Sequence, residues 1–176
     1  MSKLLNVSSS PHVRCGVSTK NLMYDVAIAM LPATIWGVMQ FGIYSLIVVV
    51  ATVLSCVLSE YLFETLMHKP VTISDGSALV TGMILGLNMP PAIPLWMPIL
   101  GGVFAIIVVK QLYGGLGQNW MNPALAARCF MLISFAQAMT KFTDPVTDAV
   151  ASATPLAAIK AGDTYDLAAM FIGKIP

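Results

Sequence analysis

The amino-acid sequence predicts an all-α membrane protein with about five transmembrane segments, one of which is a short broken helix. Only 10% of the 176 residues are charged and 57% are hydrophobic, whereas soluble domains carry about 25% charged residues. Two long stretches, residues 26–59 and 76–109, contain no Asp, Glu, Lys or Arg. Because a membrane-spanning helix needs about 20 apolar residues, each stretch is long enough for two crossings.

Proline, glycine and charged residues divide the apolar region into segments, since proline cannot continue a helix. The third segment is unusual, because its apolar run covers only residues 78–88 before Pro90-Pro91 stops it. Short interrupted segments are typical of broken helices that line a site, although close packing through Gly82 and Gly86 would explain the same pattern. The five segments cover residues 22–40, 43–67, 78–88, 95–112 and 123–139.

The distribution of charge divides the chain into an N-terminal arm (1–21), a helical membrane domain (22–140) and a C-terminal segment (141–176) in which charges return. Positively charged short loops face the cytoplasm, so we expect the arm to be cytoplasmic. Five crossings then place the C-terminal segment on the outer side. The positive residues used in this argument are Lys3, Arg14, Lys20, Lys69 and Lys110.

The composition also argues against several kinds of partner. The net charge is only +1 and no basic stripe with aromatic residues is present, so we expect the lipid bilayer and not nucleic acid as a partner. His12 and His68 are isolated in the sequence, so neither has the spacing of a metal site. No residue pattern indicates a catalytic group within the chain.

Three charged residues in or beside the segments are candidates for an ion pathway or for a structural role. They are Asp25, Asp75 and Arg128. Ionisable residues inside a membrane are functional by default. Asp25 and Asp75 also fit carboxylates that meet the positive end of a helix dipole. Arg128 would need a carboxylate, a phosphate or backbone carbonyls as a partner.

Two other features lie near segment ends. Glu60 and Glu64 are one helical turn apart in the second segment. We interpret them as a solvated face at the membrane interface or as partners of His68, while a cation pathway stays open. Asn122-Pro123 predicts the start of the fifth segment, with the amide as cap and the proline in the first helical position.

A run of small residues, 148–156, stands out in the C-terminal segment. It begins with Asp148 and contains the hydroxyl of Thr154. A threonine hydroxyl is a weak nucleophile without help, and no His or Lys is spaced to activate it, so covalent chemistry here requires a separate enzyme. The small neighbours Ser152 and Ala153 would let the peptide enter that enzyme's cleft. Alternatively, Thr154 is simply the N-cap of a helix.

Five sequence blocks resemble one family, which contains the D subunit of Rnf electron-transport complexes (RnfD) and the B subunit of the sodium-pumping NADH:quinone reductase. The resemblance implies FMN joined through a phosphoester to Thr154 by a flavin transferase, with Asp148, Ser152 and Ala153 belonging to the attachment motif. The blocks are residues 10–14 (SPHVR) with Asp25 and Leu31-Pro32-Ala33 downstream, 74–81 (SDGSALVT), 88–91 (NMPP), 117–124 (GQNWMNPA) and 148–156 (DAVASATPL).

The resemblance further implies an electron-transfer subunit of a ferredoxin:NAD⁺ oxidoreductase complex that moves Na⁺ or H⁺ across a bacterial cell membrane. The other Rnf subunits (A, B, C, E and G) would be its partners, and a second, non-covalent flavin stays open. The alternative is a channel-like or transporter-like membrane subunit without a redox role.

The sequence departs from the family pattern in two ways. Ala151 stands where the attachment motif usually has Ser or Thr, three residues before the acceptor. Family members also continue into further helices that are related to the first set by an inverted repeat. We therefore expect this chain to be a truncated first repeat.

Overall fold

The computed structural model describes residues 16–141, which form helices joined by short loops and contain no β-strand. Two helices, α1 (Thr19–Phe41) and α2 (Ile43–Leu66), are long and apolar enough to cross a membrane. The remaining elements are the 3₁₀-helix η1 (Ile73–Asp75), α3 (Ser77–Leu87), α4 (Trp96–Val103), the π-helix η2 (Phe104–Gln111), α5 (Pro123–Ser134) and α6 (Ala136–Met139).

Each of the five predicted segments is helical in the structure. The first three correspond to α1, α2 and α3, and the fourth is α4 continued by η2. The fifth is α5 with the single turn α6. Asn122 caps α5 as predicted, because its side-chain oxygen accepts from the backbone N–H groups of Ala124 and Leu125 while Pro123 occupies the first position.

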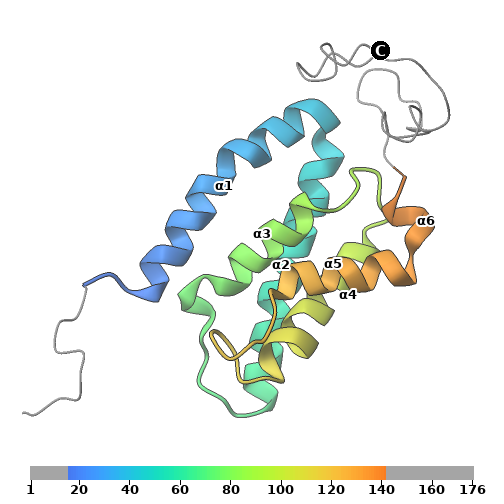
Figure 1. The fold of residues 1–176 in the computed structure, drawn as a ribbon. Helices are drawn as coiled ribbons and strands as arrows, with labels where there is room; N and C mark the ends of the chain where they lie inside the picture. The colour runs from blue at the N-terminus through green and yellow to red at the C-terminus, as the bar shows by residue number, and fades with distance from the viewer. Residues whose placement is uncertain (1–15, 142–176) are drawn as a thin grey trace, which may run out of the picture.

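A single residue, Gly42, joins α1 to α2. Its φ of 81° lies in the left-handed region, which glycine adopts without the steric cost of a side chain. Its N–H also donates to the carbonyl of Val38 at 2.9 Å and so closes α1. The chain therefore reverses direction at Gly42, and α1 and α2 diverge from this turn (Figure 1). At the same end, the Tyr44 hydroxyl donates to the Ile93 carbonyl at 3.0 Å and ties the loop before α4 to this turn.

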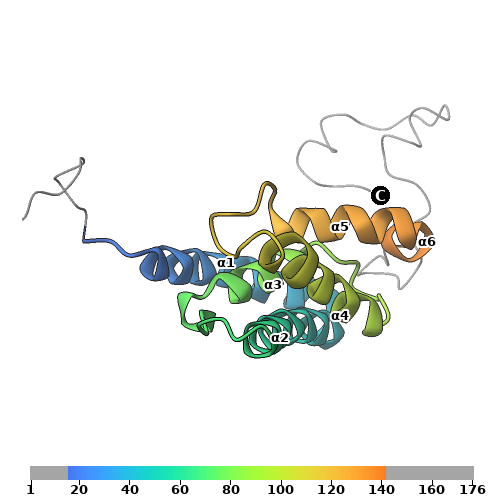
Figure 2. The ribbon, with the colours of Figure 1, turned by 90° about the horizontal axis from the view of Figure 1, so that it is seen from below.

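The short helix α3 lies in the middle of the structure, between α2 and α5 (Figure 2). Its glycines allow α2 to approach closely. A Cβ at Gly82 would lie 2.6 Å from the Cα of Val53, and one at Gly86 would lie 2.9 Å from the Cα of Val49. Real Cβ atoms do not come this close to backbone, so the two helices could not pack in this way with larger residues. Close packing through small residues thus accounts for these two glycines.

We expect Gly82→Ala to destabilise the helical domain. The new methyl group would overlap the α2 backbone at Val53, and overpacking of this kind costs about 1–3 kcal/mol. Thermal unfolding in detergent measures the change. The control is Gly37→Ala, a helical position in α1 where a Cβ meets nothing within 4 Å. Equal melting temperatures for the two variants would contradict the proposed close contact.

Aromatic pairs attach α5 and the residue that follows it to the fourth segment. The rings of Phe104 and Phe130 stack with their centroids 4.2 Å apart. The rings of Trp96 and Phe135 meet edge to face at 5.2 Å. Pairs of this kind add about 0.5–1.5 kcal/mol beyond the area they bury. They hold α5 across α4 and η2.

The outer surfaces of the helices are strongly apolar. On α1 the side chains of Ile35, Trp36 and Met39 are 60%, 63% and 74% exposed, and Ile133 on α5 is 84% exposed. Soluble monomers rarely expose contiguous apolar patches larger than a few hundred Å². Such surfaces suit contact with lipid or with other membrane proteins. The fold is accordingly that of an all-α membrane protein, as the sequence predicts.

Candidate functional site

A group of charged side chains is fully buried between α2, α3 and η2. Glu60 and Glu64 on α2 are 0% and 2% exposed, and Lys110 on η2 is 1% exposed. The Lys110 Nζ lies 2.5 Å from Glu60 Oε1. Among residues 16–141 this is the one ion pair. An ion pair removed from water is costly unless further hydrogen bonds satisfy both groups.

Ser77 and Gln111 supply such hydrogen bonds, and Asp75, Glu64 and Thr72 extend the network around them. Lys110 Nζ also donates to Ser77 Oγ at 2.5 Å, and that hydroxyl donates to Asp75 Oδ1 at 2.6 Å. The Gln111 side-chain amide donates to Oε1 of both glutamates, at 2.9 Å for Glu60 and 3.2 Å for Glu64. Both N–H and hydroxyl of Thr72 donate to Glu64. We call these seven residues the polar cluster: Glu60, Glu64, Thr72, Asp75, Ser77, Lys110 and Gln111.

The fold positions the polar cluster through three local features. The two glutamates are four residues apart on α2, so they project from the same face. Ser77 begins α3, where Asp75 Oδ1 also accepts from its backbone N–H at 2.8 Å. The third feature is η2, an eight-residue π-helix that carries both Lys110 and Gln111. The π-helix is rare and is frequently found at functional sites.

One atom of the polar cluster has no partner. Glu60 Oε2 is buried and makes no hydrogen bond with any residue that the structure describes. A buried carboxylate oxygen without a partner carries the cost of its lost hydration. This oxygen is therefore where another group could bind with a gain in free energy.

Two cavities reach the polar cluster. The first, of about 440 Å³, is lined by Ser77 and Lys110 on one side and by Asn119 and Asn122 on the other. The second, of about 300 Å³, is lined mainly by other members of the polar cluster, namely Glu64, Thr72, Asp75 and Gln111. Leu116, in the glycine-rich loop after η2, lines both cavities.

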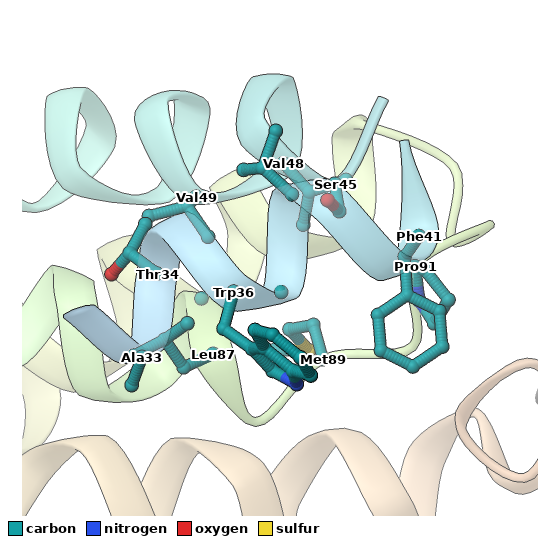
Figure 3. A pocket seen from close by; sticks show the side chains of 13 residues that line it. Ala33, Thr34, Trp36, Phe41, Ser45, Val48, Val49, Leu87, Met89 and Pro91 are labelled. Carbon is teal, nitrogen blue, oxygen red and sulfur yellow. The ribbon is translucent and has the colours of Figure 1, made fainter. Parts of the chain in front are cut away.

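A third hollow, of about 340 Å³, lies between α1, α2 and the end of α3 (Figure 3). Its walls are almost entirely apolar, with Trp36 on α1 and Met89 in the loop after α3 close to one another. Thr34 and Ser45 supply the hydroxyl groups at its edge. Nothing in these walls would recognise a charged ligand, so the chemistry of the site lies in the polar cluster.

The structure corrects two interpretations made from the sequence. Glu60 and Glu64 are not a solvated face, because both are buried against η2 and α3. Neither glutamate pairs with His68, which is exposed beyond the end of α2. Lys110 is not a free loop cation either, because its ammonium group lies in the buried ion pair. Lys20, in the first turn of α1, and Lys69, just after the end of α2, remain as exposed positive residues.

The other candidates have different surroundings. Asp75 belongs to the polar cluster and lies at the start of α3, where Gly76 is the N-cap and the Asp75 carboxylate accepts from the backbone N–H of Ser77. Asp25 is exposed on α1, outside the polar cluster. Arg128 is exposed rather than buried, and its Nη1 donates to Asn88 Oδ1 at 2.8 Å. The expected carboxylate, phosphate or carbonyl partner is thus replaced, among the described residues, by a side-chain amide at the end of α3.

The predicted attachment segment lies outside the described residues. This applies to Asp148, Ser152, Ala153 and Thr154 alike. Their assignment to covalent FMN stays a prediction from the sequence. The same is true of the N-terminal arm up to residue 15.

Residues 16–141 thus form the helical domain of a multi-pass membrane protein, with a buried charged cluster between its helices. The sequence model of the NQR2, RnfD, RnfE family matches residues 6–176. The chain belongs to this family, and the resemblance found in the sequence is confirmed.

Curated relatives agree with this assignment. The chain is 49% identical over 161 residues to the D subunit of the Na⁺-translocating ferredoxin:NAD⁺ oxidoreductase complex of Acetobacterium woodii, covering 91% of the chain and 51% of the relative. It is 42% identical over 160 residues to the D subunit of the proton-translocating ferredoxin:NAD⁺ oxidoreductase complex of Clostridium ljungdahlii, covering 89% of the chain and 48% of the relative. A third relative is the D subunit of the ion-translocating oxidoreductase complex of Shewanella denitrificans. It is 40% identical over 157 residues, which cover 88% of the chain and 45% of the relative. The chain spans about half the length of these relatives.

Proposed function

We propose that the chain is part of a membrane electron-transfer subunit in an ion-translocating ferredoxin:NAD⁺ oxidoreductase complex, and that Thr154 carries FMN through a phosphoester. The observation that carries this proposal is the family match, which extends over residues 6–176 and so includes the attachment segment. The relatives' names supply the class of complex.

The chemistry of residues 148–156 supports Thr154 as the attachment point. Its hydroxyl can form a phosphoester, and Ser152 and Ala153 present little steric bulk beside it. The following proline favours an extended backbone at Thr154, which suits entry into the cleft of a flavin transferase. Asp148 would orient the peptide in that enzyme. FMN attached here would supply one-electron redox chemistry, and the tether would prevent its loss.

The helical domain would hold this segment at the membrane and contact neighbouring subunits. Its exposed apolar side chains on α1 and α5 supply surface for lipid and for partners. By analogy with the family, the partners are the other Rnf subunits, A, B, C, E and G. The expected setting is a bacterial cell membrane.

We propose that the N-terminus is cytoplasmic and that Thr154 lies on the outer side. Five crossings are counted between the arm and Thr154, and the exposed Lys20 in the first turn of α1 and Lys69 just after α2 both lie at helix ends remote from the Gly42 turn. Positive residues favour the cytoplasmic side. An odd number of crossings then separates Thr154 from the arm.

Peptide mass spectrometry tests the flavin assignment. Trypsin cleaves after Lys141 and Lys160, so a single peptide, residues 142–160, contains Thr154. From cells that contain the transferase, this peptide should carry the mass of FMN less one water. Fragmentation distinguishes Thr154 from Thr143 and Thr147 in the same peptide. An unmodified peptide from the working complex would contradict the redox assignment.

The buried polar cluster favours a second candidate function. A channel-like or transporter-like subunit without a redox role would also need charged groups between helices and cavities that reach them. This candidate predicts ion movement by a complex in which this chain carries no flavin. Mass spectrometry of peptide 142–160 separates the two candidate functions, because only the electron-transfer subunit carries FMN on this peptide.

A further inference from the structure

We propose that the exposed side of α5 is a docking surface for a second membrane helix of the same full-length subunit, and that a carboxylate on this helix pairs with Arg128. The proposal goes beyond the electron-transfer function and does not depend on the flavin. Its support comes from the surroundings of Arg128, from the apolar residues beside it, from a hollow along α5 and from the length of the curated relatives.

Arg128 has more hydrogen-bond donors than partners. A guanidinium group carries five N–H donors, and within residues 16–141 Arg128 uses one of them, from Nη1 to Asn88 Oδ1. The Asn88 amide group in turn donates to the Ile84 carbonyl at 2.7 Å, so it is fixed at the end of α3. Asn88 is uncharged, and Arg128 forms no ion pair in the described part of the chain. The positive charge of Arg128 is therefore not neutralised by these residues.

The position of Arg128 in the fold makes lipid an unfavourable neighbour. Gly86, two residues before Asn88, packs on the Cα of Val49. Val49 lies about 9 Å from the end of α2 at Ile43, at 1.5 Å per residue. Because α2 is long enough to cross a membrane, the end of α3 and the guanidinium group that contacts it lie at the depth of the apolar helices. A charged side chain at the membrane centre costs about 2.5–3.5 kcal/mol even on the lowest scale, so a partner of opposite charge is favoured over lipid.

The residues around Arg128 form a continuous surface that we call the α5 face. At 100° per residue they project from one side of α5, with the apolar members next to one another and Arg128 on the flank. The α5 face consists of exposed residues only, namely Leu125, Arg128, Cys129, Leu132 and Ile133. The buried side of the helix consists of Ala124, Ala127 and Met131. Spacings of three and four residues are those by which one helix packs against another, so the α5 face has the pattern of a second packing surface.

A hollow of about 510 Å³ lies beside the α5 face, between α5, η2 and the loop that joins them. Leu125 and Cys129 line it from α5, and Phe104 lines it from η2. Tyr113 and Trp120, which also line it, meet edge to face with their ring centroids 6.3 Å apart. An apolar hollow beside an exposed apolar stripe suits a side chain from a helix that packs on the stripe. The surface thus offers both shape and charge to one partner.

The length of the curated relatives favours one source for the partner helix. The chain covers 51%, 48% and 45% of the three relatives described above, so each relative has about as many residues again. The helices α5 and α6 are the last that the structure describes, and consecutive elements usually lie side by side. A helix from the other half of the full-length subunit therefore covers the α5 face, in preference to another subunit or to lipid.

Photo-cross-linking in the assembled complex, with the full-length subunit that contains this chain, tests the partner. The photoreactive amino acid p-benzoylphenylalanine is placed at Ile133, the membranes are illuminated, and the cross-linked peptides are identified by mass spectrometry. We expect a peptide of the same polypeptide, from a helix outside this chain that contains an Asp or Glu. The matched control position is Ile35 on α1, which is also exposed and apolar and should not give this peptide. Cross-links to lipid only, cross-links to another subunit only, or no cross-link would each overturn the proposal.

Charge exchange tests the ion pair itself. Arg128→Glu should lower the melting temperature of the full-length subunit in detergent by several degrees, because two carboxylates would then face one another. Arg128→Lys keeps the charge and should retain most of the stability. Replacing the partner carboxylate by arginine should restore the melting temperature of Arg128→Glu, a rescue that loss of the Asn88 contact alone does not allow.

A double variant that is no more stable than Arg128→Glu would show that no such pair exists. If Arg128→Glu does not assemble, the cross-linked peptide decides, since Arg128 is unchanged in that experiment. An unmodified Thr154 peptide would overturn the flavin assignment and leave both of these results unaffected.

Discussion

Thr154→Val is expected to abolish covalent flavin in the protein. Valine keeps the branched shape of threonine but lacks the oxygen that would form the phosphoester, so the transferase has no acceptor. Flavin fluorescence of the denatured protein on a gel measures the attachment. We expect complete loss of the signal, together with loss of electron transfer through the complex, because the tethered cofactor would be the redox group at this position.

Thr147→Val is the matched control, because it makes the same change in the same tryptic peptide but seven residues before the acceptor. It should retain full fluorescence. Covalent flavin that survives in Thr154→Val, with the modified residue identified elsewhere in the chain, would show that the acceptor has been assigned wrongly.

Lys110→Met is expected to be the most destabilising single change in the helical domain. It removes the buried ammonium group of the polar cluster and leaves the carboxylates of Glu60 and Glu64 without it. Removing one partner of a buried ion pair typically costs about 3–5 kcal/mol. For a chain of this length, such a loss lowers the melting temperature by on the order of 10 °C.

The double variant Lys110→Met/Glu60→Leu provides the internal comparison. Replacing both partners of a buried pair by apolar residues is often neutral, so the double variant should recover most of the lost stability. Lys141→Met removes an exposed lysine and should change little. Thermal unfolding in detergent gives all three values. A single variant as stable as the wild type would mean that the ion pair contributes nothing.

The helices could be predicted from the sequence because their boundaries are marked locally. Pro70 follows the end of α2, Pro90-Pro91 follow α3, and Asn122-Pro123 begin α5. Each of these residues acts on its own backbone, so its effect does not depend on the rest of the fold. The apolar length between the markers then sets the number of segments.

The polar cluster could not be predicted in the same way. Lys110 and Glu60 are fifty residues apart in the sequence, and each lies near the end of a segment, where an interfacial position is the usual expectation. The π-helix that turns Lys110 and Gln111 toward α2 has no sequence signature of its own. The sequence did hold one relevant signal. Glu60 and Lys110 each end a long uncharged stretch, and the helices that carry them pack against one another, so the two side chains can meet at one level of the fold.

Arg128 was expected to be buried and is exposed, whereas the two glutamates were expected at the surface and are buried. Its position about two turns into the fifth segment suggested burial, but it lies on an exposed face of α5 in the described part of the chain. Which face of a helix is covered depends on its neighbours, and a single charged residue does not determine them.

Because η2 sets the direction of the Lys110 side chain, the Lys110–Glu60 ion pair depends on the number of residues in this helix. In an α-helix each residue turns the next by about 100°, so a one-residue deletion between Phe104 and Val109 would swing Lys110 away from Glu60 while leaving every side chain chemically intact. The i to i−5 hydrogen bond from the Leu112 N–H to the Ile107 carbonyl shows the wider winding that sets this direction. Spacing along this helix, as much as residue identity, is therefore what natural variation in this stretch must preserve.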